Sequence, residues 1–413
     1  MRKTLKKLQK ADSVFLGSGL VVALLAALFA LLYSHDLPGP ENRGIISVIF
    51  LAEVTYFTVA LGGLNISFRS HRGSIHPTKY GNAFVQISVL AALLASGVVV
   101  ATIIAYSHIK AEVAYPLILL SGFYAFLATL QNQLFQSLLS MHHIRARWKM
   151  DLLVVTVQIL VYEILKILNL FSIAVRILLA FSASYFVAIL LILITKKRLG
   201  LTVNFKQNQI ANIVQLFRSS APNYTYSIVS ALVDKIDRIL VLLLFSTGTF
   251  GKYALLTGIL SFARFLPDAV SNLVVAKRIH WIEEHLRVNS LRRTTFVLIL
   301  AITYAFAAQE TISLLFGNKW HLPFAVALLC SLSEVMRAFY TTKMSFLFDD
   351  TKSNLPSKSA ITILVIAIVI PILTRPVFSV TAVPVGLIFA YVSAFIFFKL
   401  FSKKDLTPPR GKR

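Results

Sequence analysis

The sequence predicts an all-α integral membrane protein of about twelve transmembrane helices. Three observations support this fold class: apolar residues make up 57% of the 413 residues, charged residues make up only 14%, and the mean hydropathy is +0.76. Soluble domains carry roughly 25% charged residues. Because a soluble core has no room for so much apolar surface, lipid must solvate much of this chain.

The net charge of +24 is consistent with a membrane protein. The basic residues lie mostly in short connections between apolar runs, where membrane proteins carry their topology signal, so the charge does not indicate nucleic-acid binding. Cys330 is the single cysteine, which excludes a disulfide framework and a cysteine-ligated metal site. We expect no metal and no cofactor. The first apolar run, Val14 to Tyr33, is long enough to span and has no clear cleavage site, so we expect a helix rather than a signal peptide.

Apolar runs long enough to cross a bilayer, about 20 residues each, recur along the whole chain. Connections rich in Gly, Pro or charged residues separate them, and the tightest connection lies near Asn169–Ser172. The predicted spans are, in chain order, 13–34, 44–68, 82–107, 113–140, 150–170, 172–195, 211–245, 251–275, 294–316, 321–348, 358–375 and 378–400.

The basic residues outside these spans predict the orientation. Nearly all of them fall on the connections of one side, together with the basic N-terminal stretch and the basic C-terminal end. Only five fall on the opposite side: Arg43, Lys110, Lys252, Lys319 and Arg375. Since positive charge is retained on the cytoplasmic side, we expect both termini to be cytoplasmic.

The two halves of the chain repeat one plan. Gly44 and Gly251 are 207 residues apart, and so are Pro116 and Pro323, each near the outer start of a fourth helix. Because each half contains an even number of helices, six, both halves enter the membrane from the same side. Such a parallel repeat is common among transporters. We therefore predict two domains, residues 1–200 and 201–413, with a substrate site between them.

Many ionisable residues lie inside the predicted spans, where each costs about 3 kcal/mol on insertion scales. They are Glu53, Glu163, Lys166, Arg176, Asp234, Lys235, Asp237, Arg238, Arg264, Asp268, Glu310, Glu334, Arg337 and Lys343.

Two interpretations of these charges remain open. Acids and bases spaced i,i+3 or i,i+4 share a helix face and can neutralise each other; the four such pairs are Glu163–Lys166, Glu334–Arg337, Asp234–Arg238 and Arg264–Asp268. Alternatively, Arg238, Arg264 and Arg337 lie at similar depth on three helices of the second half, which indicates a shared aqueous cavity. Arginine in such a cavity suits phosphate or pyrophosphate.

Four segments carry a resemblance to a known family. They are Leu37–Ile46 (LPGPENRGII), Asp234–Leu240 (DKIDRIL), Phe250–Ala254 (FGKYA) and Leu315–Trp320 (LFGNKW). The chain resembles, over its whole length, the bacterial O-antigen and exopolysaccharide flippases of the Wzx type. Their superfamily also contains multidrug extruders and the lipid II flippase.

The resemblance implies two pseudo-symmetric six-helix bundles around a central cavity, in the bacterial inner (plasma) membrane. It also implies a substrate, an undecaprenyl-pyrophosphate-linked oligosaccharide, moved from the cytoplasmic to the periplasmic leaflet by alternating access. By analogy with the lipid II flippase, Arg264 is a pyrophosphate-contacting candidate. Candidate protein partners are a polysaccharide polymerase and a chain-length regulator.

The functional hypothesis places Lys235, Arg238 and Arg337 beside Arg264 around the pyrophosphate. The acids Glu53, Asp234, Asp237, Asp268 and Glu334 would hold these bases or titrate during the return step.

Two rival functions remain. A cation-coupled multidrug or small-molecule exporter of the same superfamily is the first. The second is an enzyme, a polysaccharide polymerase or lipid-linked glycosyltransferase, which the short outer connections disfavour. No Walker loop, HExxH or GxSxG motif occurs, so we expect a transporter and no enzyme.

Overall fold

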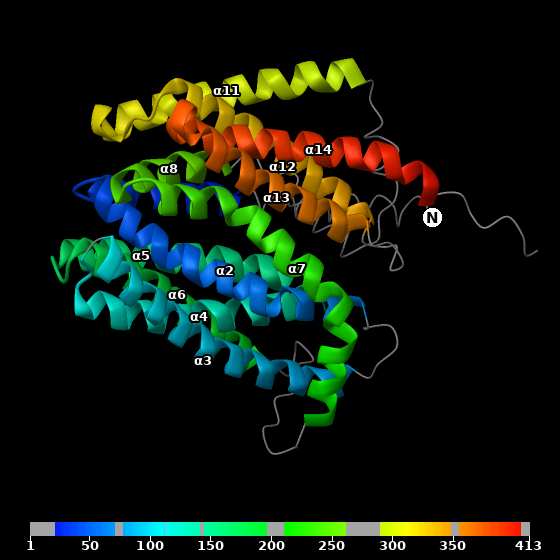
Figure 1. Cartoon of the computed structure of the whole chain (residues 1–413). Coiled ribbons are helices and arrows are strands. Elements are labelled where there is room, and N and C mark those ends of the chain that lie inside the picture. The colour runs from blue at the N-terminus through cyan, green and yellow to red at the C-terminus, as the bar shows by residue number, and fades with distance from the viewer. Residues whose placement is uncertain are drawn as a thin grey trace, which may run out of the picture. The chain divides into compact units, whose positions relative to one another are not determined.

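The computed structural model describes residues 21–70, 77–110, 112–140, 144–195, 210–261, 290–347 and 355–405. Helices joined by short connections make up these ranges, and no strand occurs within them (Figure 1). The helices follow one another in the order of the predicted spans. Among the described residues, seven helices are long and apolar enough to cross a membrane.

The chain divides into two compact units, residues 1–228 and 229–413. The division falls inside α7 (Ile210–Leu244). The predicted domain boundary at residue 200 lies outside the described residues, so it stays a prediction.

Unit 1 begins, within the described chain, with an apolar helix, Val21–Asp36. Five longer helices follow before α7: α2 (Pro40–Ser70), α3 (Pro77–Ile109), α4 (Tyr115–Ser140), α5 (Ile144–Ile167) and α6 (Ile173–Thr195). Helix α4 packs against α2, α3, α5 and α6, so it is the central helix of the unit.

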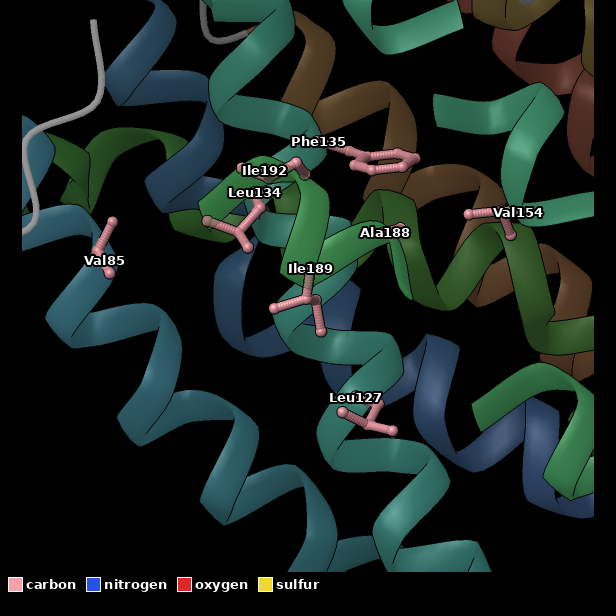
Figure 2. Packing of buried hydrophobic residues seen from close by; sticks show 8 residues of the cluster. All are labelled: Val85, Leu127, Leu134, Phe135, Val154, Ala188, Ile189 and Ile192. Carbon is pink, nitrogen blue, oxygen red and sulfur yellow. The ribbon is translucent and has the colours of Figure 1, made fainter. Parts of the chain in front are cut away.

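A hydrophobic cluster holds α4 to its neighbours α3, α5 and α6. Figure 2 shows its eight buried side chains, Val85, Leu127, Leu134, Phe135, Val154, Ala188, Ile189 and Ile192. Their branched and aromatic groups interlock, and close packing of this kind drives helix association where lipid is already apolar.

The least apolar spans are the most buried. Helix α4 and α12 (Phe324–Leu347) share the lowest mean hydropathy of the seven candidate spans, yet 67% and 56% of their windows are buried, the two largest fractions. Lipid-facing helices must be apolar, whereas a helix surrounded by protein can carry hydrogen-bonding groups. The polar residues of these two helices therefore indicate an interior position.

A tight turn separates α5 from α6. The predicted number of helices depends on this connection, because one continuous helix here would lower the count by one. Asn169 and Phe171 adopt left-handed backbone conformations, with φ of 49° and 63°. Arg176 stabilises the turn by donating from Nε to the carbonyls of Leu170 (2.7 Å) and Phe171 (2.9 Å), and from Nη2 to Asn169 Oδ1 (2.8 Å). Arg176 thus satisfies two carbonyls of the connection itself, which follows the end of α5.

Lys166 pairs with an acid on another helix. Its Nζ lies 2.7 Å from Asp36 Oδ2, and the Tyr162 hydroxyl donates to the same carboxylate at 2.7 Å. The i,i+3 pattern favoured Glu163 as the partner of Lys166, and the structure corrects this. The reason is geometric: the helix Val21–Asp36 ends beside α5, which places the Asp36 carboxylate in contact with Lys166 and Tyr162.

Replacing Asp36 by asparagine should make stability less sensitive to acid. Burial alone raises the pKa of the Asp36 carboxyl, but the hydrogen bonds from Lys166 and Tyr162 outweigh it, so the pKa is lowered from its usual 3.8. A lowered pKa gives stability that is present above about pH 4 and lost as the pH falls through the folded value. We expect Asp36→Asn to cost about 1 kcal/mol at pH 7. The stability difference between the two proteins should shrink as the pH falls through the folded pKa, measured as unfolding midpoints in detergent.

Unit 2 contains the end of α7, then α8 (Thr247–Leu260), α11 (Ser290–Phe316), α12, α13 (Leu355–Phe378) and α14 (Ala382–Asp405). Helix α12 packs against α8, α11 and α14. Helices α13 and α14 form a tight hairpin, joined by a single 3-10 turn at Ser379–Thr381.

The α13–α14 hairpin depends on a glycine. A Cβ at Gly386 of α14 would lie 2.5 Å from both Cγ and Cδ of Pro371 on α13. The proline ring is rigid, so an added methyl group must push the two helices apart.

Gly386→Ala should therefore lower the unfolding free energy by about 1–3 kcal/mol. Gly258→Ala in α8 of the same unit is the matched control, because nothing lies within 4 Å of its added Cβ. That control should be neutral or stabilise by up to about 1 kcal/mol. Thermal unfolding of the detergent-solubilised protein measures both, and equal midpoints for the two variants would contradict the packing argument.

Candidate functional site

A buried arginine connects three helices of unit 2. The Arg337 side chain of α12 is 1% exposed. Its Nη1 lies 3.4 Å from Glu334 Oε1 and donates to the Asp234 carbonyl at 3.2 Å. Its Nη2 lies 3.7 Å from Asp237 Oδ1, and its Nε donates to the Tyr391 hydroxyl at 2.9 Å. The guanidinium therefore joins α12 to α7 and α14.

Hydroxyl groups extend this polar network to two more helices. The Tyr253 hydroxyl of α8 donates to Asp237 Oδ2 at 3.4 Å. The Tyr391 ring packs against Tyr340 with centroids 5.7 Å apart, and the Tyr340 hydroxyl lies 3.0 Å from Ser359 Oγ on α13. Five helices of unit 2 thus meet at one buried polar cluster, which we call the Arg337 network: Asp234, Asp237, Tyr253, Glu334, Arg337, Tyr340, Ser359 and Tyr391.

The network sets three acids, Asp234, Asp237 and Glu334, against one guanidinium, so Arg337 offsets only part of their formal negative charge. Asp237 and Glu334 are each 1% exposed and bring negative charge to the buried guanidinium, and Asp234 also interacts with it electrostatically. Buried charges persist only when they are paired and hydrogen-bonded. Arg337 thus acts as the internal counter-ion of unit 2.

The structure brings together part of the site predicted from sequence. The i,i+3 pair Glu334–Arg337 forms, and α7 supplies Asp234 and Asp237 to the same guanidinium. Lys235 and Arg238 of α7 are half-buried, and neither is without an interaction partner. Arg264 and Asp268 lie outside the described residues.

The assignment of Arg264, Arg238, Lys235 and Arg337 to a pyrophosphate stays a prediction. Among the described contacts, the Arg337 guanidinium is surrounded by protein groups and closed to solvent. The aromatic members of the network, Tyr253, Tyr340 and Tyr391, did not stand out in the sequence. Tyrosines are common in apolar spans, and only their contacts distinguish these three.

Unit 1 holds its own buried carboxylate. Glu53 of α2 is 1% exposed, and the Thr129 hydroxyl of α4 donates to its Oε1 at 3.4 Å. Tyr124 and Tyr185 interact with it electrostatically, and their rings lie 6.0 Å apart. An acid among hydroxyl groups in a helical bundle is suited to taking up a proton or a cation.

Comparison with known protein families finds no match, and no curated protein matches the sequence. Several solved structures resemble the fold. A mutant form of the MATE transporter VcmN of Vibrio cholerae is 13% identical, with 97% of this chain and 98% of that chain covered and a TM-score of 0.67. The eukaryotic MATE transporter AtDTX14 is 13% identical, with 98% and 96% covered and a TM-score of 0.66.

Two further matches are multidrug resistance MATE family transporters of the MOP superfamily, one inward-facing and one outward-facing. Both are 13% identical to this chain. The inward-facing structure covers 94% of this chain and 96% of its own, with a TM-score of 0.59. The outward-facing structure covers 95% of both chains, with a TM-score of 0.60. The shared fold confirms the predicted all-α, multi-pass membrane architecture. At this identity the likeness establishes the fold alone.

Proposed function

We propose that this protein is a membrane transporter that exports its substrate by alternating access. The observation that carries the proposal is the similarity of nearly the whole chain to MATE transporters, including an inward-facing and an outward-facing structure. The division into two compact units supports it, because alternating access commonly moves one half of a transporter against the other.

The first candidate substrate class is small organic molecules, exported in exchange for a cation or proton. The comparisons favour this candidate, since two of the similar structures are multidrug resistance transporters. Glu53 supplies the buried carboxylate that cation coupling needs.

The second candidate is an undecaprenyl-pyrophosphate-linked oligosaccharide, flipped between leaflets. The resemblance of segments 37–46, 234–240, 250–254 and 315–320 to polysaccharide flippases favours it. So does Arg337, which offsets part of the negative charge that Asp237 and Glu334 would otherwise present to a cationic drug.

One pair of assays on a strain deleted for the gene separates these candidates. The small-molecule candidate predicts several-fold higher accumulation of a fluorescent organic cation after deletion, with unchanged surface polysaccharide. The flippase candidate predicts loss of surface polysaccharide and unchanged cation accumulation. Restoration by the plasmid-borne gene is the control. If neither quantity differs between the deletion strain and the strain whose plasmid-borne protein is inserted and folded, the export proposal is wrong.

A further inference from the structure

Unit 1 contains a buried arginine with two unsatisfied donor nitrogens. Arg43, near the start of α2, is 7% exposed. Its Nε and Nη1 are both buried and have no hydrogen-bond partner among the described residues. An unpaired buried donor loses its hydrogen bond to water and gains none from the protein, and this cost is larger when the group is charged.

The surroundings of Arg43 do not offset its charge. The guanidinium carbon lies 4.6 Å from the ring centroid of Tyr33, and that ring belongs to a cluster that includes Phe29, Leu37 and Ile46. Among the described residues no carboxylate forms an ion pair with Arg43. The carboxylate of Asp36, which is close in sequence, is engaged by Lys166 and Tyr162.

The contact with Tyr33 stabilises the cation only in part. A cation over an aromatic face is attracted by the ring, but this contact provides no acceptor for the N–H groups, which point outward in the guanidinium plane. A water molecule could accept from these groups, yet it would bring no negative charge. A buried guanidinium that forms no ion pair among the described residues therefore lacks a counter-ion.

We propose that Arg43, stacked on Tyr33 at the start of α2, is a binding site for an oxoanion, a phosphate or pyrophosphate group. Such oxygens accept charge-assisted hydrogen bonds from arginine, and the positive end of the α2 dipole adds to the attraction. The site lies at the end of α2 that the charge bias predicts to face the outer side. The anion has two sources: a phospholipid headgroup at the interface, or the phosphate of a transported molecule.

The site goes beyond the proposed function and is tested without any transport assay. The full chain is purified in maltoside micelles, which carry no phosphate, and its unfolding midpoint is measured with three additions. These are sodium pyrophosphate, phosphatidylglycerol, and sodium chloride at matched ionic strength. We expect pyrophosphate or phosphatidylglycerol to raise the midpoint of the wild-type protein by about 3 °C or more over the chloride sample.

Arg43→Met should lose that rise, and in anion-free micelles it should be at least as stable as the wild type, because it removes an uncompensated buried charge. Arg176→Met is the matched control: it removes the same charge from the same end of unit 1, but Arg176 is already satisfied by Leu170, Phe171 and Asn169. It should be less stable in every sample and keep the anion-induced rise.

The two additions distinguish the sources. A rise with phosphatidylglycerol alone assigns the site to lipid, and a rise with pyrophosphate assigns it to a soluble or transported phosphate. If neither addition stabilises the wild type more than Arg43→Met, the site does not exist. Arg43→Gln repeats the test in case the methionine variant does not fold. Because the readout is thermal stability, a failed transport assay leaves this result unaffected.

Discussion

Replacing Arg337 by methionine should lower the unfolding free energy by about 3–5 kcal/mol. The substitution keeps an unbranched side chain about as far as Nε and removes the positive charge, so Asp237 and Glu334 remain buried, at 1% exposure each, without the guanidinium that offsets them. It also removes the donors to the Tyr391 hydroxyl and the Asp234 carbonyl, which join α12 to α14 and α7. The loss should appear as a lower midpoint in SDS titrations of the purified protein.

Two further variants make this prediction specific. Arg375→Met removes an exposed arginine from α13 of the same unit, where its guanidinium lies over Phe245 at 5.4 Å. It should cost less than about 1 kcal/mol. The triple variant Arg337→Met, Asp237→Asn, Glu334→Gln removes all three charges and should recover most of the lost stability. Burying a charged side chain costs free energy even when it is paired, and the triple variant removes this cost for all three residues. A triple variant as unstable as the single one would show that charge balance is not the cause.

Glu53→Gln should reduce transport at least about tenfold while leaving the fold intact, if Glu53 takes up the coupling proton or cation. The amide keeps the shape of the carboxylate and still accepts the hydrogen bond from Thr129, but it cannot titrate. Since a buried carboxylate costs free energy, the variant should be as stable as the wild type or slightly more stable. The measurement is substrate uptake into inverted vesicles, in the assay that identifies the substrate.

A purely structural role for Glu53 predicts a different pair of results: lower stability and transport reduced only in proportion to the folded fraction. Glu53→Asp is the conservative variant and should retain part of the activity, because a titratable group remains. Thr129→Val removes the hydroxyl donor at the same place and should have a smaller effect on transport than Glu53→Gln. Full transport by Glu53→Gln would remove Glu53 from the coupling step.

The sequence predicted the helices well and the contacts of single residues less well. The two helices beside the tight turn were separated correctly, although the Arg176 bonds that hold this turn become visible only in the structure. The pair Glu334–Arg337 follows from i,i+3 spacing on one helix. The partner of Lys166 does not, because Asp36 lies 130 positions away along the chain and only folding brings the two together.

The sequence by itself indicated that lipid solvates much of the chain, in which order the spans follow, and which orientation they are expected to take. These properties are readable from the sequence because the bilayer acts on each segment separately, and length, apolar content and flanking charge are local properties. The tertiary structure decided which charges are interior. Arg337 and Arg43 are both buried, yet Arg337 contacts acids and a tyrosine hydroxyl, whereas the contact that the described residues give to the Arg43 guanidinium is the Tyr33 ring. That difference depends on which side chains neighbouring helices present at the same depth, and no local pattern in the chain contains this information.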